Sequence, residues 1–308
     1  MDSIAFSEYM IITGIILMIA NLIASIFKLF FRPDALYISG KTKTLSNVLL
    51  IFLELLFISA SIVTMHYDNT AIAVAPALFA IAITFSALLI LGFVQMRGIS
   101  ALSMRILERL VGVIEAGDEN LDGHSLHVQN LTMLIYDHLP FSARLRLNPT
   151  NLEYASLLLD IGKLGIPRSI IHKAGKLSKD ERELIQKHPE ICMEIFSSID
   201  SLKTITLWIK YHHERVDGSG YYHLTGKEIP LASRILAVAD TYSAITMDRS
   251  YRPSLPYENA ISELHLVAGK QLDEELVNLF CSIPKSKIEA CMNDVRDRMK
   301  KYQSGTFR

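Results

Sequence analysis

The chain lacks cysteine pairs and any excess of charge of one sign. Its 308 residues include three cysteines, Cys192, Cys281 and Cys291, and no C-x-x-C pair. This scarcity excludes a disulfide framework and a zinc knuckle. Lys and Arg number 31 and Asp and Glu number 32, so the formal net charge of −1 excludes a basic protein built to bind DNA or RNA. Half of the residues are hydrophobic, which excludes a disordered chain.

Charge is scarcest in the first third of the chain. Residues 1–96 carry four basic and five acidic side chains, whereas the remaining 212 residues carry 27 of each. The second density is that of an ordinary soluble domain, in which about a quarter of the residues are charged. The change near Met96 therefore predicts two parts of different kinds.

Three long apolar runs lie in the first part, at 9–27, 45–65 and 70–96. A helix of about 20 apolar residues crosses a bilayer core, so we expect a three-helix transmembrane module in contact with membrane lipid. Basic residues lie between the first two runs and after the third, which predicts a multi-pass protein of the inner (cytoplasmic) membrane, with its N-terminus outside and its C-terminal domain cytoplasmic. Glu54 falls within the second run, where it either bonds a neighbouring helix or senses a signal or ion.

The second part begins with an amphipathic segment. Residues 97–117 place Leu102, Ile106, Leu110, Val111 and Ile114 on one stripe, which predicts either a dimerising linker helix or the first core helix of the domain. No alternating strand pattern follows, so we predict an all-α domain over 111–285 and a C-terminal tail over 286–308. The sequence Ser178-Lys179-Asp180-Glu181 has the form of a capping box and predicts a helix start.

Histidine and aspartate are concentrated in a few stretches of this domain. These stretches hold His124, Asp160, His188, His212, His213, Asp217 and Asp240. Neutral imidazoles with a few carboxylates suit Fe, Mn or Zn better than Ca or Mg. Lys163 follows Asp160 by three residues and shares its helix face. A carboxylate on metal beside a lysine suits a phosphate substrate, and Arg249 and Arg252 could neutralise further phosphate charge. We assign the other histidines, His127 among them, to surface or core positions.

The ordered set of motifs resembles one family. The stretches are EAGDENLDGHS, LLLDIGKLGIP, KAGKLSKDERELIQKHPE, YHHERVDGSGYY, IPLASRILAVADTYSAITMDRSYR and AGKQLD. Together, from about residue 111 to 281, they closely resemble the HD-GYP family, the branch of the HD superfamily associated with cyclic di-GMP hydrolysis. The resemblance implies an all-helical domain with two or three metal ions, usually iron or manganese, and cleavage of cyclic di-GMP to pGpG or GMP.

The resemblance also implies residue roles. The metal ligands would be His124, Asp160, His188, His212, His213 and Asp240, with Asp160 bridging two ions. Asp160 and Lys163 would be catalytic, and the nucleotide would contact Lys163, Tyr221, Arg249 and Arg252.

Three positions depart from the family pattern. Leu159 stands where the HD dyad has its histidine, so one metal ion loses an imidazole ligand. Asn120 stands where some members carry a glutamate that supports a third metal ion, so we expect two divalent ions at most. Tyr222 replaces the proline of the GYP triplet, which softens the loop but removes no ligand.

Three hypotheses remain open from the sequence. The first is an active, membrane-anchored cyclic di-GMP phosphodiesterase with an altered metal site. The second is a catalytically impaired member that acts as a cyclic di-GMP receptor or scaffold. The third is an HD phosphohydrolase that acts on another nucleotide, such as a related cyclic dinucleotide. A homodimer is compatible with each of them.

Overall fold

The structure is a computed structural model that describes residues 3–31, 51, 54–55, 57–58, 61–62, 68–116, 123–173, 175–199, 202–248 and 253–304. Its regular elements in these ranges are α-helices and short 3-10 helices, with two isolated β-bridges and no strand. The all-α prediction is therefore confirmed for the described part of the chain. The chain divides into two compact units, Met1–Ser103 and Met104–Arg308.

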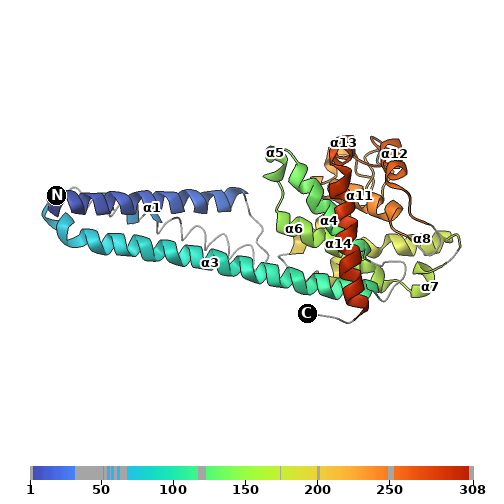
Figure 1. The fold of residues 1–308 in the computed structure, drawn as a ribbon, viewed down its shortest axis with the longest axis horizontal. Helices are drawn as coiled ribbons and strands as arrows, with labels where there is room; N and C mark the ends of the chain where they lie inside the picture. Colours follow the sequence, from blue (N-terminus) through green and yellow to red (C-terminus); the bar gives the residue numbers. More distant parts are fainter. Residues whose placement is uncertain are drawn as a thin grey trace. The chain divides into compact units, whose positions relative to one another are not determined.

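The first unit is built from two long helices. Helix α1 spans Ser3–Phe31, and helix α3 begins in this unit and spans Asp68–Ala116 (Figure 1). They pack where side chains are small, because Gly14 lies next to Ala82. The Asn21 side-chain amide donates to the Ser86 hydroxyl at 2.7 Å, and that hydroxyl donates to the Ala82 carbonyl at 2.7 Å. Polar groups inside this apolar pair are thus satisfied by each other.

The predicted membrane location is corrected by the structure. The expected spans 9–27 and 70–96 lie in α1 and α3, and 45–65 falls largely outside the described residues. Crossing a membrane needs a sufficiently long and continuously apolar helix, and none of the helices in the described ranges meets that requirement. The prediction of a multi-pass inner-membrane protein with an outside N-terminus and a cytoplasmic C-terminal domain was therefore wrong. The length of the apolar runs in the sequence had suggested this location. Glu54 is buried, and its role stays a prediction.

The second unit is a helical domain centred on α4 (His124–His138). This helix packs against α6 (Pro149–Leu158), α11 (Leu231–Thr246) and α14 (Lys285–Gln303). Helix α10 (Lys203–Lys210) packs on α6 and α9 (His188–Ile195), and α9 packs on the 3-10 helix η1 (Ile161–Gly165). The core between them includes Leu131, Ile135, Ile235, Val238 and Phe280.

Shorter elements complete the domain. They are α5 (Phe141–Arg144), α7 (Arg168–Ile171), α8 (Lys179–Gln186), η3 (Gly226–Glu228), α12 (Tyr257–Val267) and α13 (Glu274–Ser282). Helix α14 occupies most of 286–308, the segment expected as a tail. Val295 and Met299 are buried there.

The stretch 178–199 begins as the capping box predicts and contains two helices. The Ser178 hydroxyl accepts from the Glu181 amide at 3.2 Å, and the Glu181 carboxylate accepts from the Ser178 amide at 2.7 Å, so the predicted capping box is present. Helix α8 ends at Gln186, and Pro189 lies in the first turn of α9. Proline is favoured there because the first turn needs no amide donor. The new helix start places His188 at the domain's interior.

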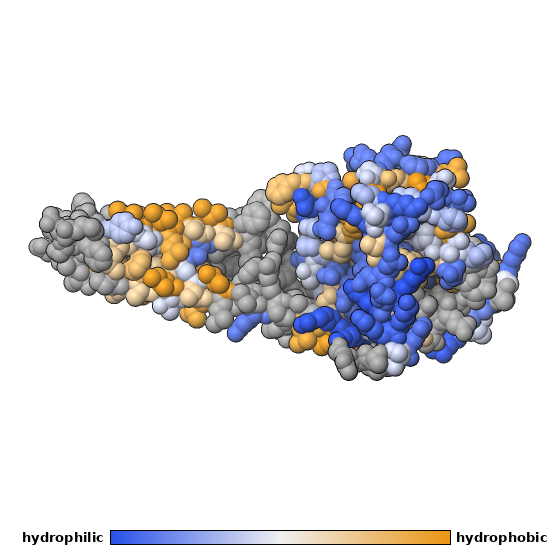
Figure 2. Space-filling view, in the orientation of Figure 1, coloured by the Kyte–Doolittle hydropathy of each residue, from blue (hydrophilic) through white to orange (hydrophobic). Residues whose placement is uncertain are grey.

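Surface hydropathy differs between the two units. In Figure 2, orange side chains gather on the described part of the first unit, whereas the second unit is mostly blue on this face. Ile16 and Ile23 of α1 and Ile90 of α3 are each more than 60% exposed within the described structure. The second unit instead buries polar groups, and those groups form the site described next.

Candidate metal centre

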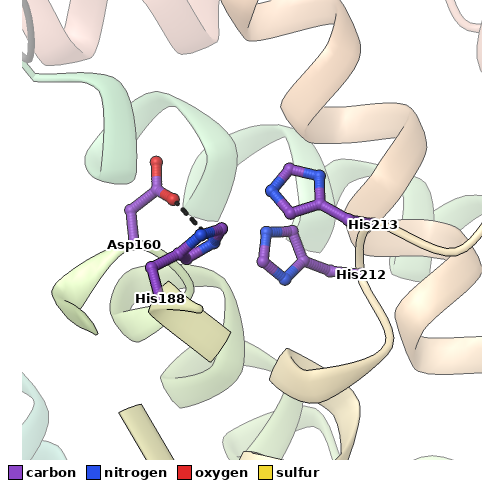
Figure 3. Close-up of side chains that lie close together, drawn as sticks. All are labelled: Asp160, His188, His212 and His213. Carbon is purple, nitrogen blue, oxygen red and sulfur yellow. Dashed lines mark ion pairs between the residues drawn. The ribbon is translucent and has the colours of Figure 1, made fainter. Parts of the chain in front are cut away.

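Four side chains converge in the interior of the second unit (Figure 3). They are Asp160, His188, His212 and His213, and their ligand atoms all lie within 4.8 Å of one another. Asp160 directly precedes η1, His188 begins α9, and the two adjacent histidines lie in the turn after α10. Segments from three places in the sequence thus supply one cluster.

Main-chain carbonyls orient two of these imidazoles. His188 Nδ1–H donates to the Ile185 carbonyl at 2.9 Å, and His212 Nδ1–H donates to the Ile209 carbonyl at 2.6 Å. A neutral imidazole that donates through Nδ1 has its lone pair on Nε2. Both Nε2 atoms therefore face the cluster as acceptors.

The cluster has the chemistry of a metal site. His188 Nε2, His212 Nε2 and Asp160 Oδ1 are buried and have no hydrogen-bond partner among the described residues. His188 Nε2 and Asp160 Oδ1 lie 3.5 Å apart (Figure 3). Three buried acceptors without a donor are costly, and a divalent cation satisfies all of them at once. The residues present therefore fit a metal ion with nitrogen and oxygen ligands.

A second group of side chains adjoins the cluster. His124 Nε2 lies 3.0 Å from Asp240 Oδ1 and 3.7 Å from Asp160 Oδ2. Lys163 Nζ donates to Asp160 Oδ2 at 2.6 Å. The structure thus brings all six predicted metal ligands and Lys163 into one region, with Asp160 between the two groups.

Burial and charge set the protonation of the cluster. Burial would raise the pKa of Asp160, but Lys163 and the surrounding imidazoles hold that pKa well below its usual range. Burial lowers the pKa of His188 to about 4 and lowers the pKa of His213 strongly. The carboxylate is therefore ionised and these imidazoles are neutral at pH 7, which are the forms that bind metal.

A buried glutamate holds the loop that carries Tyr221. The Glu214 carboxylate accepts from the Tyr222 and Leu224 amides, both at 2.6 Å. Gly220 lies so close to the Glu214 backbone that a side chain would not fit. The Tyr221 ring consequently lies 4.8 Å, between centroids, from that of His213. Arg249 and Arg252 lie outside the described residues.

Leu159 offers no donor atom to a metal ion. Its side chain is fully buried and belongs to the hydrophobic core. Asn120, the other departure that bears on the metal count, lies outside the described residues.

Sequence reasoning missed two groups beside His124. Ser243 Oγ lies 2.9 Å from His124 Nδ1 and 3.0 Å from His127 Nδ1. The spacing could have pointed to them, because His127 follows His124 by three residues and Ser243 follows Asp240 by three. The pairing itself depends on how α4 meets α11, which no local pattern encodes.

Buried histidines and aspartates gathered between helices define this unit as a helical domain with a candidate metal site. Residues 119–276, about half of the chain, match the HD domain family, and the chain belongs to that family. Members of this family depend on metal ions, and the His/Asp cluster is a possible binding site for one.

Curated relatives of the chain are named as phosphodiesterases of cyclic dinucleotides. The cyclic di-GMP phosphodiesterase response regulator RpfG of Xanthomonas campestris is 33% identical over 175 residues, which cover 56% of this chain and 46% of the relative. A cyclic di-GMP phosphodiesterase of Thermotoga maritima is 38% identical over 139 residues, with 44% and 38% covered. The 3'3'-cGAMP-specific phosphodiesterase 3 of Vibrio cholerae is 35% identical over 164 residues, with 53% and 35% covered. The chain spans less than half the length of these relatives.

Proposed function

We propose that this protein is a metal-dependent phosphodiesterase of the HD-GYP type that hydrolyses cyclic di-GMP to pGpG or GMP. The observation that carries the proposal is the buried cluster in which Asp160, His188 and His212 present three acceptor atoms without a donor. Relatives named as cyclic di-GMP phosphodiesterases support the choice of substrate.

The six histidines and aspartates would hold at most two divalent ions, iron or manganese, and Asp160 would belong to both groups of ligands. Such ions lower the pKa of water and polarise the phosphorus–oxygen bond. Each hydrolysis adds one water, breaks the bond from phosphorus to the 3′ oxygen, and leaves a 5′ phosphate and a 3′ hydroxyl. Lys163, beside Asp160, neutralises phosphate charge, and Tyr221 packs against the nucleotide from its place beside His213. Arg249 and Arg252 contact the remaining phosphate oxygens.

A catalytically impaired receptor or scaffold for cyclic di-GMP is the second candidate. It is favoured by Leu159, which has no donor atom and takes the place of the first residue of the HD dyad. A third candidate, hydrolysis of another cyclic dinucleotide, is favoured by the relative named as specific for 3'3'-cGAMP.

Leu159→His in the full chain separates the first two candidates. We expect it to raise the bound metal per chain and the rate of cyclic di-GMP hydrolysis, both measured on proteins loaded with manganese. Leu152→His is the matched control, because Leu152 is equally buried in the same core and lies on α6, which ends next to Leu159. Both changes cost stability, but only the first adds a ligand.

The outcomes assign the function. Turnover of cyclic di-GMP by the wild type supports the phosphodiesterase, and faster turnover of 3'3'-cGAMP supports the third candidate. No turnover by either form, with nucleotide still bound, supports the receptor. A wild-type chain that binds neither metal nor nucleotide contradicts all three.

The proposal extends to a homodimer through one face of α3. Ile106, Leu110 and Val113 follow a spacing of four and three residues and are 50%, 55% and 49% exposed. This spacing is that of a coiled-coil seam. Leu110→Glu is expected to shift the protein from dimer to monomer in sedimentation, whereas the neighbouring exposed change Arg109→Glu leaves it dimeric. A monomeric wild type contradicts the dimer.

A further inference from the structure

Two helix faces meet beside the metal cluster through one hydroxyl. His124 and His127 lie one turn apart on α4, and Asp240 and Ser243 lie one turn apart on α11. Ser243 Oγ is within 3.0 Å of the Nδ1 atom of each imidazole. All three side chains are buried, with exposed fractions of 2% for His124, 1% for His127 and 0% for Ser243. Water therefore does not compete for these hydrogen bonds.

Without a metal ion and with His124 neutral, the hydrogen bonds have one consistent arrangement. His124 Nε2–H donates to the Asp240 carboxylate at 3.0 Å, because a carboxylate can only accept. A neutral His124 then has its lone pair on Nδ1, so the Ser243 hydroxyl donates to it. The Ser243 oxygen in turn accepts from His127 Nδ1–H. Each of these polar atoms has a partner of the opposite kind.

A metal ligand role for His124 requires the reverse arrangement. His124 must present a lone pair on Nε2, which moves its proton to Nδ1. His124 Nδ1–H then donates to Ser243 Oγ, which has a second lone pair and still accepts from His127. The hydroxyl proton turns instead to Met247 Sδ, which lies 3.3 Å from Ser243 Oγ. A hydroxyl can reverse its direction in this way, whereas an apolar side chain offers neither arrangement.

We infer that Ser243 is a positioning residue that lets His124 present Nε2 to a metal ion, and that His127 holds the Ser243 hydroxyl in place. The inference rests on the proposed function, in which His124 is a metal ligand. It assigns to Ser243 and His127 a role in metal affinity rather than in contact with the substrate. Outer partners that fix the tautomer of a ligating histidine commonly change metal affinity about 10–100-fold.

The test measures Zn²⁺ affinity of the full chain by competition with a chromophoric chelator. Ser243→Ala is expected to weaken the binding of Zn²⁺ about 10–100-fold. Ser233→Ala is the matched control, since Ser233 is a fully buried serine of the same helix that donates to the Trp208 carbonyl at 2.8 Å and not to an imidazole. It is expected to keep wild-type affinity. Ser243→Thr and Ser243→Val have the same shape and differ in the hydroxyl alone, so the first is expected to bind Zn²⁺ more tightly than the second even if Ser243→Ala does not fold.

A second readout follows the proton of His124 itself. In ¹⁵N spectra, with the His124 signals assigned by their loss in His124→Gln, the proton is expected on Nε2 without Zn²⁺ and on Nδ1 with it. Equal affinity in Ser243→Thr and Ser243→Val, or a proton already on Nδ1 before Zn²⁺ is added, overturns the inference while leaving the metal site standing. A wild-type chain that binds no Zn²⁺ overturns the inference and the proposed function together.

Discussion

In one half of the candidate metal centre, His188 and His212 are oriented by the main-chain carbonyls of Ile185 and Ile209. In the other half, His124 is oriented only by side chains, those of Asp240 and Ser243. The first half keeps its acceptor atoms unpaired, whereas in the second half both ring nitrogens of His124 are paired without an ion. Main-chain partners come with the fold and cannot rotate away. The first half is therefore ready for a cation, and the second must exchange hydrogen bonds to receive one.

This difference predicts two classes of metal affinity. An ion in the first half becomes the partner of buried acceptors that otherwise have none. The free-energy cost of leaving those acceptors unpaired is present in the metal-free fold and is removed when the ion binds. An ion next to His124 must first displace the bond between His124 and Asp240. Asp160 belongs to both halves, since its two oxygens face His188 and His124 respectively.

Asp160→Asn is expected to have the largest effect, because it removes the charge that both halves share. The amide also brings a donor into a cluster of acceptors. We expect metal content to fall by more than the roughly 10–100-fold caused by loss of an outer partner, and hydrolysis to disappear. Metal analysis and a cyclic di-GMP assay measure the two, with circular dichroism to check folding. Retained turnover would show that the assignment of the site is wrong.

Gly162→Ala is expected to disrupt the first half of the site, in which main-chain carbonyls orient His188 and His212. A Cβ at Gly162 would overlap the carbonyl oxygen of His188, and neither backbone can yield cheaply. We expect a loss of about 3 kcal/mol in unfolding free energy, at the upper end for overpacking, together with weaker metal binding.

The matched control for that change is Gly175→Ala. No heavy atom of the described residues lies within 4 Å of a Cβ at Gly175, so the unfolding free energy should change by about 0.5 kcal/mol or less. Equal effects of the two alanines in urea denaturation would contradict the close packing of η1 on α9.

Acid is expected to destabilise both halves of the metal-free chain. Burial lowers the pKa of His188 to about 4 and of His127 to about 3, from 6.5. Their contribution to stability is therefore complete above about pH 6.5 and is lost as the pH falls, because the unfolded chain then binds more protons. Burial raises the pKa of Glu115 from 4.5 to about 7, and that contribution is instead lost as the pH rises through this window.

Three imidazoles, with His213, outweigh one carboxyl, so unfolding free energy should be at least about 2 kcal/mol lower at pH 4.5 than at pH 6.5. Denaturation in the presence of a chelator measures the difference. Glu115→Gln removes the opposing contribution and should steepen the dependence. A flat profile in that variant would contradict the burial of neutral imidazoles.

The comparison also separates what local sequence can predict from what it cannot. The lack of alternating strand patterns predicted an all-α domain, and the capping box predicted the start of α8. The ordered motifs named six histidines and aspartates that the structure brings into one region. Ser243 and His127 were missed because their contact joins residues 116 apart and depends on the packing of two helices. The membrane location was wrong because apolar run length alone does not determine whether a helix qualifies as a span.

Met247→Leu is expected to have the smallest effect. It tests a single hydrogen bond in the second half of the site, in which side chains orient His124. In the metal-bound arrangement the Ser243 hydroxyl donates to Met247 Sδ, and leucine removes that acceptor at nearly constant volume. Sulfur is a weak acceptor, so we expect Zn²⁺ affinity to fall only about threefold. Met292→Leu is the control, since Met292 lines the same cavity as Met247 and has no part in the pairing of His124. If Met247→Leu lowered Zn²⁺ affinity as much as Ser243→Ala does, Met247 would shape the site by packing. The Ser243 hydroxyl would then not be what distinguishes the half that contains His124 from the half that contains His188 and His212.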